Sequence, residues 1–264
     1  MTATPTTLAH ARHCTDSELL TVISSHFLAG KRRVFAGIGL PTLAVALAAR
    51  TTSPLIEQIY ESGVCGAHPH KLPETIADSS LATGAEAILS MSTLFGYVLQ
   101  GGHVDVGFLG AAQIDRHGSL NSSVIGPWDQ PQVRLPGSGG AIEVMANSQE
   151  VFVVLRRHDP RSLVNQLDFC TSPSLVRARQ AHPKVPTRGK GVTTVITNLG
   201  VLRADQDGEL RLAAVHEGVS IREVVAATGW PLQLSDSVEV LSPPTAEELQ
   251  LLREEVDPAR VYLR

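Results

Sequence analysis

The sequence predicts an α/β fold, and two observations lead to this prediction. Short apolar runs typical of strands alternate along the chain with segments whose apolar residues recur at helical spacing. Residues 104–109 form a nearly continuous apolar run, as expected for a strand of a parallel sheet that is covered on both faces. No internal repeat or low-complexity linker interrupts the pattern. Residues 16–264 are therefore expected to form one domain, preceded by a flexible arm of residues 1–15.

The first helix is expected to begin at Asp16, which can cap it, and to end at Gly30. Its apolar residues fall on one face at helical spacing, which predicts a helix that is buried on one side: Leu19, Leu20, Ile23 and Phe27.

The next elements are expected to be a strand over residues 33–36, a helix over residues 42–50 and a strand over residues 55–60. A glycine turn, Gly37-Ile38-Gly39, joins the first strand to its helix. This turn could present amide N–H groups to an anionic ligand, or it could serve only close packing, and the sequence leaves both interpretations open.

Further along the chain, apolar periodicity predicts a helix over residues 88–100 that ends at two glycines, followed by the apolar strand over residues 104–109. The remaining elements are expected to be helices over residues 141–146, 220–228 and 246–255 and strands over residues 151–155, 192–197, 199–202 and 210–215, the last two forming a hairpin.

The composition excludes several classes of partner. Hydrophobic residues make up 43% and charged residues 18% of the 264 positions, and the net charge of -4 gives no general attraction to nucleic acid. No apolar run reaches the roughly 18 residues that span a bilayer. The three cysteines show neither pairing nor metal-ligand spacing. We therefore expect a cytoplasmic protein with reduced thiols that binds neither nucleic acid nor membrane.

The candidate nucleophile is Glu61, which follows an apolar strand and enters the turn Ser62-Gly63. A strand end that breaks into a glycine-containing loop can present a reactive side chain on rigid backing, close to bare main chain. A solvated loop glutamate is the alternative interpretation of this residue.

Two later loops could supply partners for such a carboxylate. Residues 135–141 are glycine-rich, and main chain without side-chain cover lets a ligand approach its N–H groups. Residues 110–123 are dense in small and polar side chains and include Asn121, which could instead stabilise a surface turn.

Other polar groups carry weaker signals. His68 and His70 stand two residues apart without a third ligand at a supporting spacing, which is typical of loop histidines. Arg156, Arg157 and His158 form a small basic cluster with Arg161 that could meet a phosphate or simply face solvent.

Taken in order, several stretches resemble the β subunit of a family I CoA-transferase of the glutaconate CoA-transferase type. The likeness covers most of the chain from about Asp16. The stretches that carry it are Glu61-Ser62-Gly63, residues 110–121 with Gln113, Asp115, Gly118 and Asn121, Gly137-Ser138-Gly139-Gly140-Ala141, Asp168 with Thr171-Ser172-Pro173, and Arg253-Glu254-Glu255-Val256-Asp257-Pro258.

The resemblance implies an open α/β sheet with helices on both faces, related to ribose-phosphate isomerase-like folds, and a separate α chain that completes a heterodimer or larger heteromer. It implies that Glu61 attacks an acyl-CoA thioester. It also implies that Gly137, Gly139 and Gly140, and less directly Asn121, lie at the reacting carbonyl or at CoA. Coenzyme A and a carboxylic acid would be substrates, with no metal and no tightly bound cofactor.

Carboxylate attack on a thioester forms a mixed anhydride and then a glutamyl-CoA thioester, and each tetrahedral step develops an oxyanion that needs N–H donors. Cys65 could act as a second nucleophile or be a small buried thiol. Relatives that cleave carbon–carbon bonds, as lyases, decarboxylases or ring-cleaving hydrolases, give the alternative function. A non-catalytic acyl-CoA sensor is a third possibility.

Overall fold

The computed structural model describes residues 14–69, 71–184 and 187–263. The expected arm over residues 1–15 therefore lies almost wholly outside the described residues, as does His70. Within the described part, the first helix is capped by Thr15 rather than by Asp16, because the Thr15 hydroxyl accepts from Glu18 N–H while the Glu18 carboxylate accepts from Thr15 N–H.

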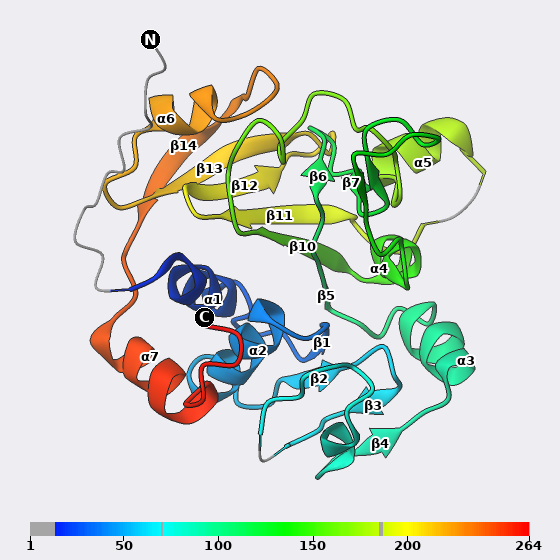
Figure 1. The fold of residues 1–264 in the computed structure, drawn as a ribbon, viewed down its shortest axis with the longest axis vertical. Helices are drawn as coiled ribbons and strands as arrows, with labels where there is room; N and C mark the ends of the chain where they lie inside the picture. The colour runs from blue at the N-terminus through cyan, green and yellow to red at the C-terminus, as the bar shows by residue number, and fades with distance from the viewer. Residues whose placement is uncertain (1–13, 70, 185–186, 264) are drawn as a thin grey trace.

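A ten-stranded mixed sheet runs through the molecule in the order β14-β13-β12-β11-β10-β5-β1-β2-β3-β4 (Figure 1). Its strands are β1 (Arg33–Phe35), β2 (Glu57–Ile59), β3 (Val64–Cys65), β4 (Ala87–Ile88), β5 (Val106–Leu109), β10 (Glu150–Leu155), β11 (Val192–Thr197), β12 (Gly200–Ala204), β13 (Leu210–His216) and β14 (Leu234–Leu241).

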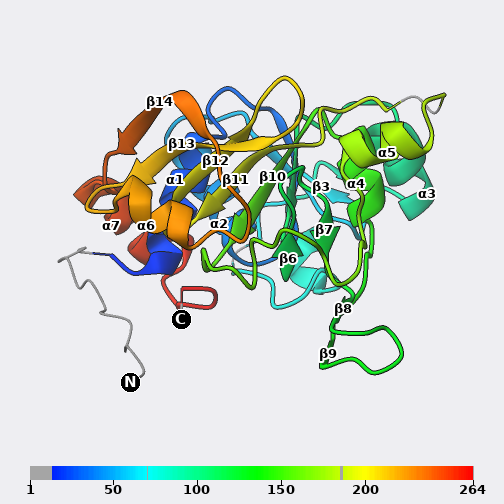
Figure 2. The same ribbon diagram turned by 90° about the horizontal axis from the view of Figure 1, so that it is seen from above.

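Two small two-stranded sheets accompany the large one: β6 (Gln113–Ile114) with β7 (Leu120–Asn121), and β8 (Val124–Ile125) with β9 (Val133–Arg134). The β8–β9 hairpin stands away from the body of the molecule (Figure 2).

The central strands β11, β10, β5, β1 and β2 are parallel, and the expected hairpin is the antiparallel pair β12–β13. The chain leaves β1 for β2 on one side and later returns to β5 on the other side. A parallel sheet opens a crevice beyond the carboxyl ends of its strands where the chain changes direction in this way. The segments after β1, β2 and β5 meet in that crevice.

Helices cover both faces of the sheet, and β10 shows the two environments. Val151, Val153 and Leu155 join one core cluster, while Phe152 and Val154 pack into another on the opposite face. Helices α1 (Asp16–His26), α2 (Leu40–Arg50), α7 (Ala246–Leu251) and η3 (Leu252–Val256) lie on the second face; α3 (Met91–Thr93), η2 (Leu94–Leu99), α4 (Ala141–Asn147) and α6 (Ile221–Ala226) lie on the first. The short α5 (Leu175–Ala181) and η1 (Ser79–Ala82) complete the set.

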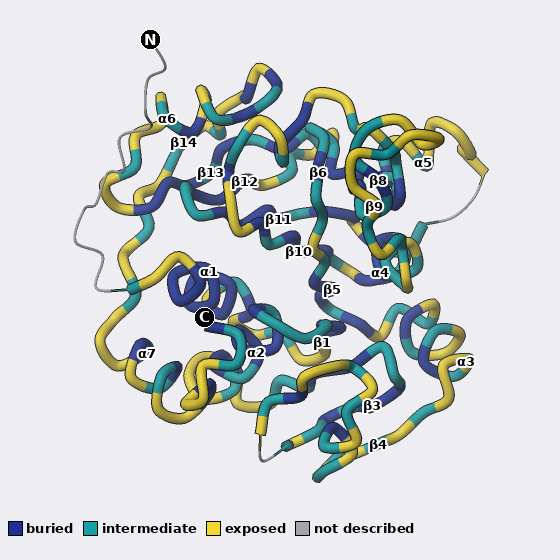
Figure 3. The backbone as a smooth tube through the Cα atoms, in the orientation of Figure 1, coloured by how far each residue is buried: buried dark blue, intermediate teal, exposed yellow. Residues whose placement is uncertain are grey.

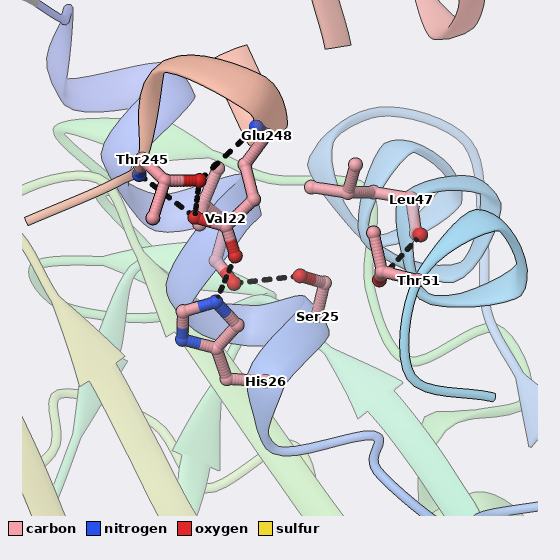
Figure 4. Close-up of polar contacts among 7 residues, drawn as sticks. All are labelled: Val22, Ser25, His26, Leu47, Thr51, Thr245 and Glu248. Carbon is pink, nitrogen blue, oxygen red and sulfur yellow. Dashed lines mark hydrogen bonds and ion pairs between the residues drawn. The ribbon is translucent and has the colours of Figure 1, made fainter. Parts of the chain in front are cut away.

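Helix α1 is buried all round, not on one face as its pattern predicts (Figure 3). The C-terminal helices close over its polar side. His26 contacts Glu248, whose carboxylate also completes the capping box of Thr245 (Figure 4). The buried carboxylate of Glu18 pairs with Arg253 at 2.6 and 3.0 Å. This hydrogen bond from Arg253 holds the pKa of Glu18 below its ordinary value, so the buried carboxylate stays charged and paired.

The predicted helix over residues 88–100 is wrong at its start. Ala87 and Ile88 pair with Cys65 and Val64 as strand β4, and the helix begins only at Met91, capped by the Ser90 hydroxyl. Its second part, η2, has the wider turn of a π-helix. The pairing of β4 with β3 overrides the local helical pattern. Strand β14 and helix α5 had no counterpart in the sequence prediction. None of the helices in the described parts of the chain is long and apolar enough to span a bilayer.

His158 does not belong to a basic surface cluster, because it is buried at the end of β10. Its Nδ1 lies 2.9 Å from Thr197 Oγ1 and its Nε2 lies 2.9 Å from Thr228 Oγ1. Thr228 Oγ1 donates to Val224 O, so it is placed to accept from an imidazole N–H. Burial lowers the pKa of His158 from 6.5 to about 4, which the nearby Asp159 only partly offsets. The imidazole is therefore neutral at pH 7.

Acid should destabilise the fold through His158. The unfolded chain binds a proton there below about pH 6.5 and the folded chain only near pH 4, so the free energy of unfolding falls as pH drops through this window. By about pH 5 the loss is about 2 kcal/mol. Urea unfolding at pH 7 and pH 5 should show a smaller loss for His158→Gln than for wild type. Equal losses would contradict this assignment.

Candidate functional site

A cavity of about 420 Å³ lies beyond the carboxyl ends of β1, β2 and β5. Phe35 ends β1, Glu61 follows β2, and Gly110 follows β5, so the switch in chain direction brings the three segments together. The other wall is the loop that leads into α4. Apart from Glu61 the lining is apolar or small: Phe35, Gly37, Ile76, Phe108, Leu109, Gly110, Ala111, Ala112, Ser122, Leu135, Pro136, Gly137, Ser138, Gly140, Ala141 and Val144.

The turn after β2 fixes the backbone of Glu61. Gly63 N–H donates to Tyr60 O at 2.9 Å, and Leu89 N–H donates to Gly63 O at 2.9 Å. Gly63 has a φ of +96°, and a Cβ at this position would lie 2.0 Å from Leu89 O. Only glycine fits such a turn, because the backbone is left-handed and the neighbouring main chain fills the space of a side chain. The half-buried Glu61 therefore points into the cavity from a rigid support.

The glycine-rich loop brings its main chain up to this carboxylate. Gly140 N–H donates to Glu61 Oε1 at 3.0 Å. A Cβ on Gly140 would lie 3.1 Å from Glu61 Oε1 and 2.7 Å from the Phe95 ring, so the approach requires a glycine. Gly139 has a φ of +46°, and a Cβ there would lie 3.6 Å from the same oxygen. For its N–H the described part of the chain supplies no acceptor. The sequence-predicted residues Glu61, Gly139 and Gly140 thus lie together.

Gly137 anchors the loop instead of presenting a donor. Its N–H donates to Ser122 O at 2.9 Å, and the Ser122 hydroxyl donates to Gly137 O at 2.8 Å. Ser122 lines the cavity and was not among the predicted site residues. Its position next to Asn121, in the densest run of small polar residues, is the only sequence signal that could have identified it.

Asn121 lies behind this wall, fully buried on β7. Its amide nitrogen donates to Gln113 Oε1 at 2.8 Å and to Val124 O at 2.7 Å, while its Oδ1 accepts from Ser123 N–H at 3.0 Å. Both amide hydrogens are used within the protein. Through these hydrogen bonds Asn121 helps to hold the loop that contains Ser122. Direct donation to a substrate stays a prediction, and it would require one of these bonds to break.

The segment with Asp168 and Thr171 supports the same loop. Asp168 Oδ2 accepts from Gly126 N–H at 2.9 Å and from Gln113 Nε2 at 3.2 Å. Thr171 Oγ1 accepts from Ser122 N–H at 3.0 Å. These residues hold the wall of the cavity without lining it.

Cys65 and His68 lie outside the cavity that contains Glu61. Burial raises the pKa of the Cys65 thiol, with Glu57 and Glu86 adding to the effect, so the thiolate that a nucleophilic cysteine needs is disfavoured. His68 lines a second, larger cavity of about 730 Å³ beside α2 and the C-terminal segment. Across the described ranges of the chain, His, Cys, Asp and Glu side chains form no group of three or more that could hold a metal ion.

Comparison with known proteins gives a consistent result. The family model described as coenzyme A transferase matches residues 20–227. The chain is 39% identical to the B subunit of 3-oxoadipate CoA-transferase from Pseudomonas knackmussii, over 90% of this chain and 91% of that one. The solved structure of glutaconate coenzyme A-transferase from Acidaminococcus fermentans superposes with a TM-score of 0.86 at 27% identity, covering 96% and 98% of the two chains. The cholesterol ring-cleaving hydrolase IpdB subunit from Rhodococcus jostii is 33% identical, over 57% of this chain and 58% of that one.

If Asn121 has a structural role, its substitution should lower the free energy of unfolding. Asn121→Ala leaves groups of the buried Gln113 and Val124 and of the half-buried Ser123 short of partners, which should lower the free energy of unfolding by about 2–3 kcal/mol. Asn165→Ala is the matched control, because Asn165 is exposed and, within the described residues, its side chain makes a single 3.4 Å contact, with Arg116. Urea unfolding measures both variants. An Asn121→Ala protein that is as stable as the control variant would contradict a structural role for Asn121.

Proposed function

The chain belongs to the coenzyme A transferase family, and on this basis we propose that Glu61 carries CoA between an acyl-CoA donor and a carboxylic acid acceptor. Relatives that match it over most of its length are B subunits of CoA-transferases. The chain is accordingly the B-type, or β, subunit of a heteromeric enzyme and acts with an α subunit. We further propose a cytoplasmic location, because the three cysteines show no pairing pattern in the sequence and a reducing compartment suits such a chain.

One observation carries the proposed role of Glu61: its carboxylate lies in the cavity with Oε1 bound to Gly140 N–H at 3.0 Å. That bond orients the carboxylate and satisfies one oxygen. The second oxygen, Oε2, is left to attack a carbonyl carbon.

In the first half of the reaction, Glu61 Oε2 attacks the thioester carbonyl carbon, the C–S bond breaks, and CoA leaves as a thiolate. The product is a mixed anhydride between the acyl group and Glu61. The thiolate then attacks the Glu61 carboxyl carbon, and the bond from that carbon to the bridging oxygen of the anhydride breaks. These two steps release the donor acid and leave Glu61 joined to CoA as a thioester.

In the second half, the acceptor carboxylate attacks the Glu61 carboxyl carbon and displaces the CoA thiolate, which forms a second mixed anhydride. The thiolate attacks the acyl carbonyl of that anhydride, and the C–O bond to Glu61 breaks. The new acyl-CoA leaves and the Glu61 carboxylate is restored. One thioester has replaced another and no water has been consumed, which suits the apolar lining.

Two different oxyanions develop in this sequence, and we propose one loop amide for each. When a nucleophile attacks the Glu61 carboxyl carbon, the charge develops on Glu61 Oε1, to which Gly140 N–H already donates. When Glu61 or the thiolate attacks the acyl carbonyl, the charge develops on the substrate. We assign Gly139 N–H to that second oxyanion. Loss of one such donor costs about 3–4 kcal/mol of transition-state stabilisation in a protease.

Carbon–carbon bond cleavage, the activity named for the ring-cleaving relative, is the alternative function. The presence of Glu61 on the cavity wall and the raised pKa of Cys65 both favour CoA transfer.

Glu61 should be labelled during turnover. The enzyme assembled with its α subunit is incubated with acyl-CoA and treated with borohydride, which reduces a glutamyl thioester to an alcohol that peptide mapping locates. Glu61→Gln should lower kcat at least about a thousandfold, since a nucleophile is lost. Glu57→Gln, which changes an acid at the start of the same strand, is the control. Full turnover with unmodified Glu61 would refute the mechanism.

Turnover should also require an acceptor acid. With acyl-CoA alone, the assembled enzyme should release at most about one equivalent of donor acid per site, because CoA stays on Glu61 until a carboxylate arrives. Chromatography of the acids and CoA esters measures this. Continued consumption of the CoA ester without an acceptor would favour the hydrolase or lyase alternative.

A further inference from the structure

We propose that Phe95, presented by the π-helical turn η2, is a positioning residue for Glu61 that acts through the main chain of Gly140. This inference rests on the proposed role of Glu61. It assigns a task to a side chain that does not line the cavity and that no sequence motif identified.

The geometry of η2 sets the position of Phe95. Gln100 N–H donates to Phe95 O at 2.9 Å and His103 N–H donates to Val98 O at 3.0 Å, each spanning five residues. The wider turn lets Leu94 and Leu99, five residues apart, both be fully buried in the core cluster beneath the site. Single π-turns of this kind occur frequently at functional sites. Here the two anchors fix the backbone from which Phe95 projects.

The Phe95 ring lies against the Cα of Gly140. A Cβ added to Gly140 would meet Phe95 Cζ at 2.7 Å and Cε1 at 2.9 Å. The ring also packs against Phe35, at a centroid distance of 6.1 Å and an interplanar angle of 67°. Phe35 is itself buried at the end of β1 and lines the cavity. Edge-to-face packing of this kind stabilises the position of the ring.

The ring therefore packs against Gly140 on the side that a Cβ would occupy, which is also the side near Glu61 Oε1. Gly140 has no side chain of its own to restrict its backbone, and glycine is the residue with the most conformational freedom. With the ring in place, Gly140 N–H stays directed at Glu61 Oε1. Without it, the peptide has space to rotate, and the donor leaves the position where the glutamyl oxyanion develops.

This arrangement predicts which steps depend on Phe95. Attack on the Glu61 carboxyl carbon places charge on Oε1 and uses Gly140 N–H, so formation and breakdown of the glutamyl-CoA thioester should slow when the ring is removed. Substrate binding should change little, because the ring does not line the cavity.

The test uses the enzyme assembled with its α subunit and compares Phe95→Leu with Phe27→Leu. Phe27 also makes an edge-to-face pair, with Phe152 at 6.3 Å, and does not line the cavity, so its substitution controls for the loss of a packed ring. The glutamyl-CoA enzyme is prepared with acyl-CoA, freed of excess ester and mixed with acceptor acid. Loss of the thioester is then followed by quenching with borohydride.

Phe95→Leu should slow this step at least about tenfold, with the KM for the acceptor within about twofold of wild type. Phe27→Leu should match wild type in rate. If Phe95→Leu also matches wild type, or if only its KM changes, the inference is overturned. If wild type itself forms no glutamyl-CoA, the proposed function fails, which is a separate outcome.

A double-mutant cycle with Gly140→Ala tests the route of the effect. The added methyl group would overlap the Phe95 ring in the wild-type background, whereas Phe95→Leu removes that overlap and leaves the 3.1 Å approach to Glu61 Oε1 as the remaining close contact. If Phe95 acts through Gly140, the double variant should be much less impaired than the product of the two single effects. Simple multiplication of the two effects would show that Phe95 acts by another route and would overturn the inference.

Discussion

The approach of bare main chain to a carboxylate is the constraint on which the rest of the site depends. Gly140 N–H donates to Glu61 Oε1 at 3.0 Å, and a Cβ at position 140 would meet both that oxygen and the Phe95 ring. The parallel strands bring Glu61 to the edge of the sheet where the loop lies, and Ser122 secures Gly137 so that the loop reaches it. Each of these contacts helps to hold Gly140 N–H within hydrogen-bond distance of Glu61 Oε1.

The two faces of the sheet have different roles: the helices on one face stabilise the fold, and the layer on the other face contributes to the candidate site. On one face, α1 is enclosed by α2 and the C-terminal helices, and its buried Glu18 is matched by Arg253. Asp257, also fully buried, accepts N–H bonds from Val261 and Tyr262 and so closes the chain end against this layer. The cavity opens at the strand ends, and the layer over the other face supplies its glycine loop and its aromatic backing. A substitution in the C-terminal segment would therefore act on folding before it acts on chemistry.

Much of this arrangement could be predicted from the sequence, because its signals are local. Apolar runs and glycine turns identify β1, β2, β5 and the loop before α4, and the ordered motifs identify Glu61 with Gly139 and Gly140. What could not be predicted depends on contacts between distant segments. The pairing of Ile88 with β3 converts the start of an expected helix into a strand. The burial of Asn121 depends on its hydrogen bonds to Gln113 and Val124. The proposed positioning role of Phe95 depends on its contact with Gly140, 45 positions later in the chain.

The donor that faces position 61 belongs to the backbone, and this has a consequence for how the scaffold can diverge. A mutation of Glu61 removes the proposed nucleophile but leaves the Gly140 amide, the Phe95 ring and the Ser122 anchor in place, because none of them is contributed by the glutamate side chain. The pocket would then keep an unoccupied anion-binding point beside an apolar chamber. A fold of this kind can lose one reaction in a single step and still hold the enolate, carboxylate or oxyanion of another.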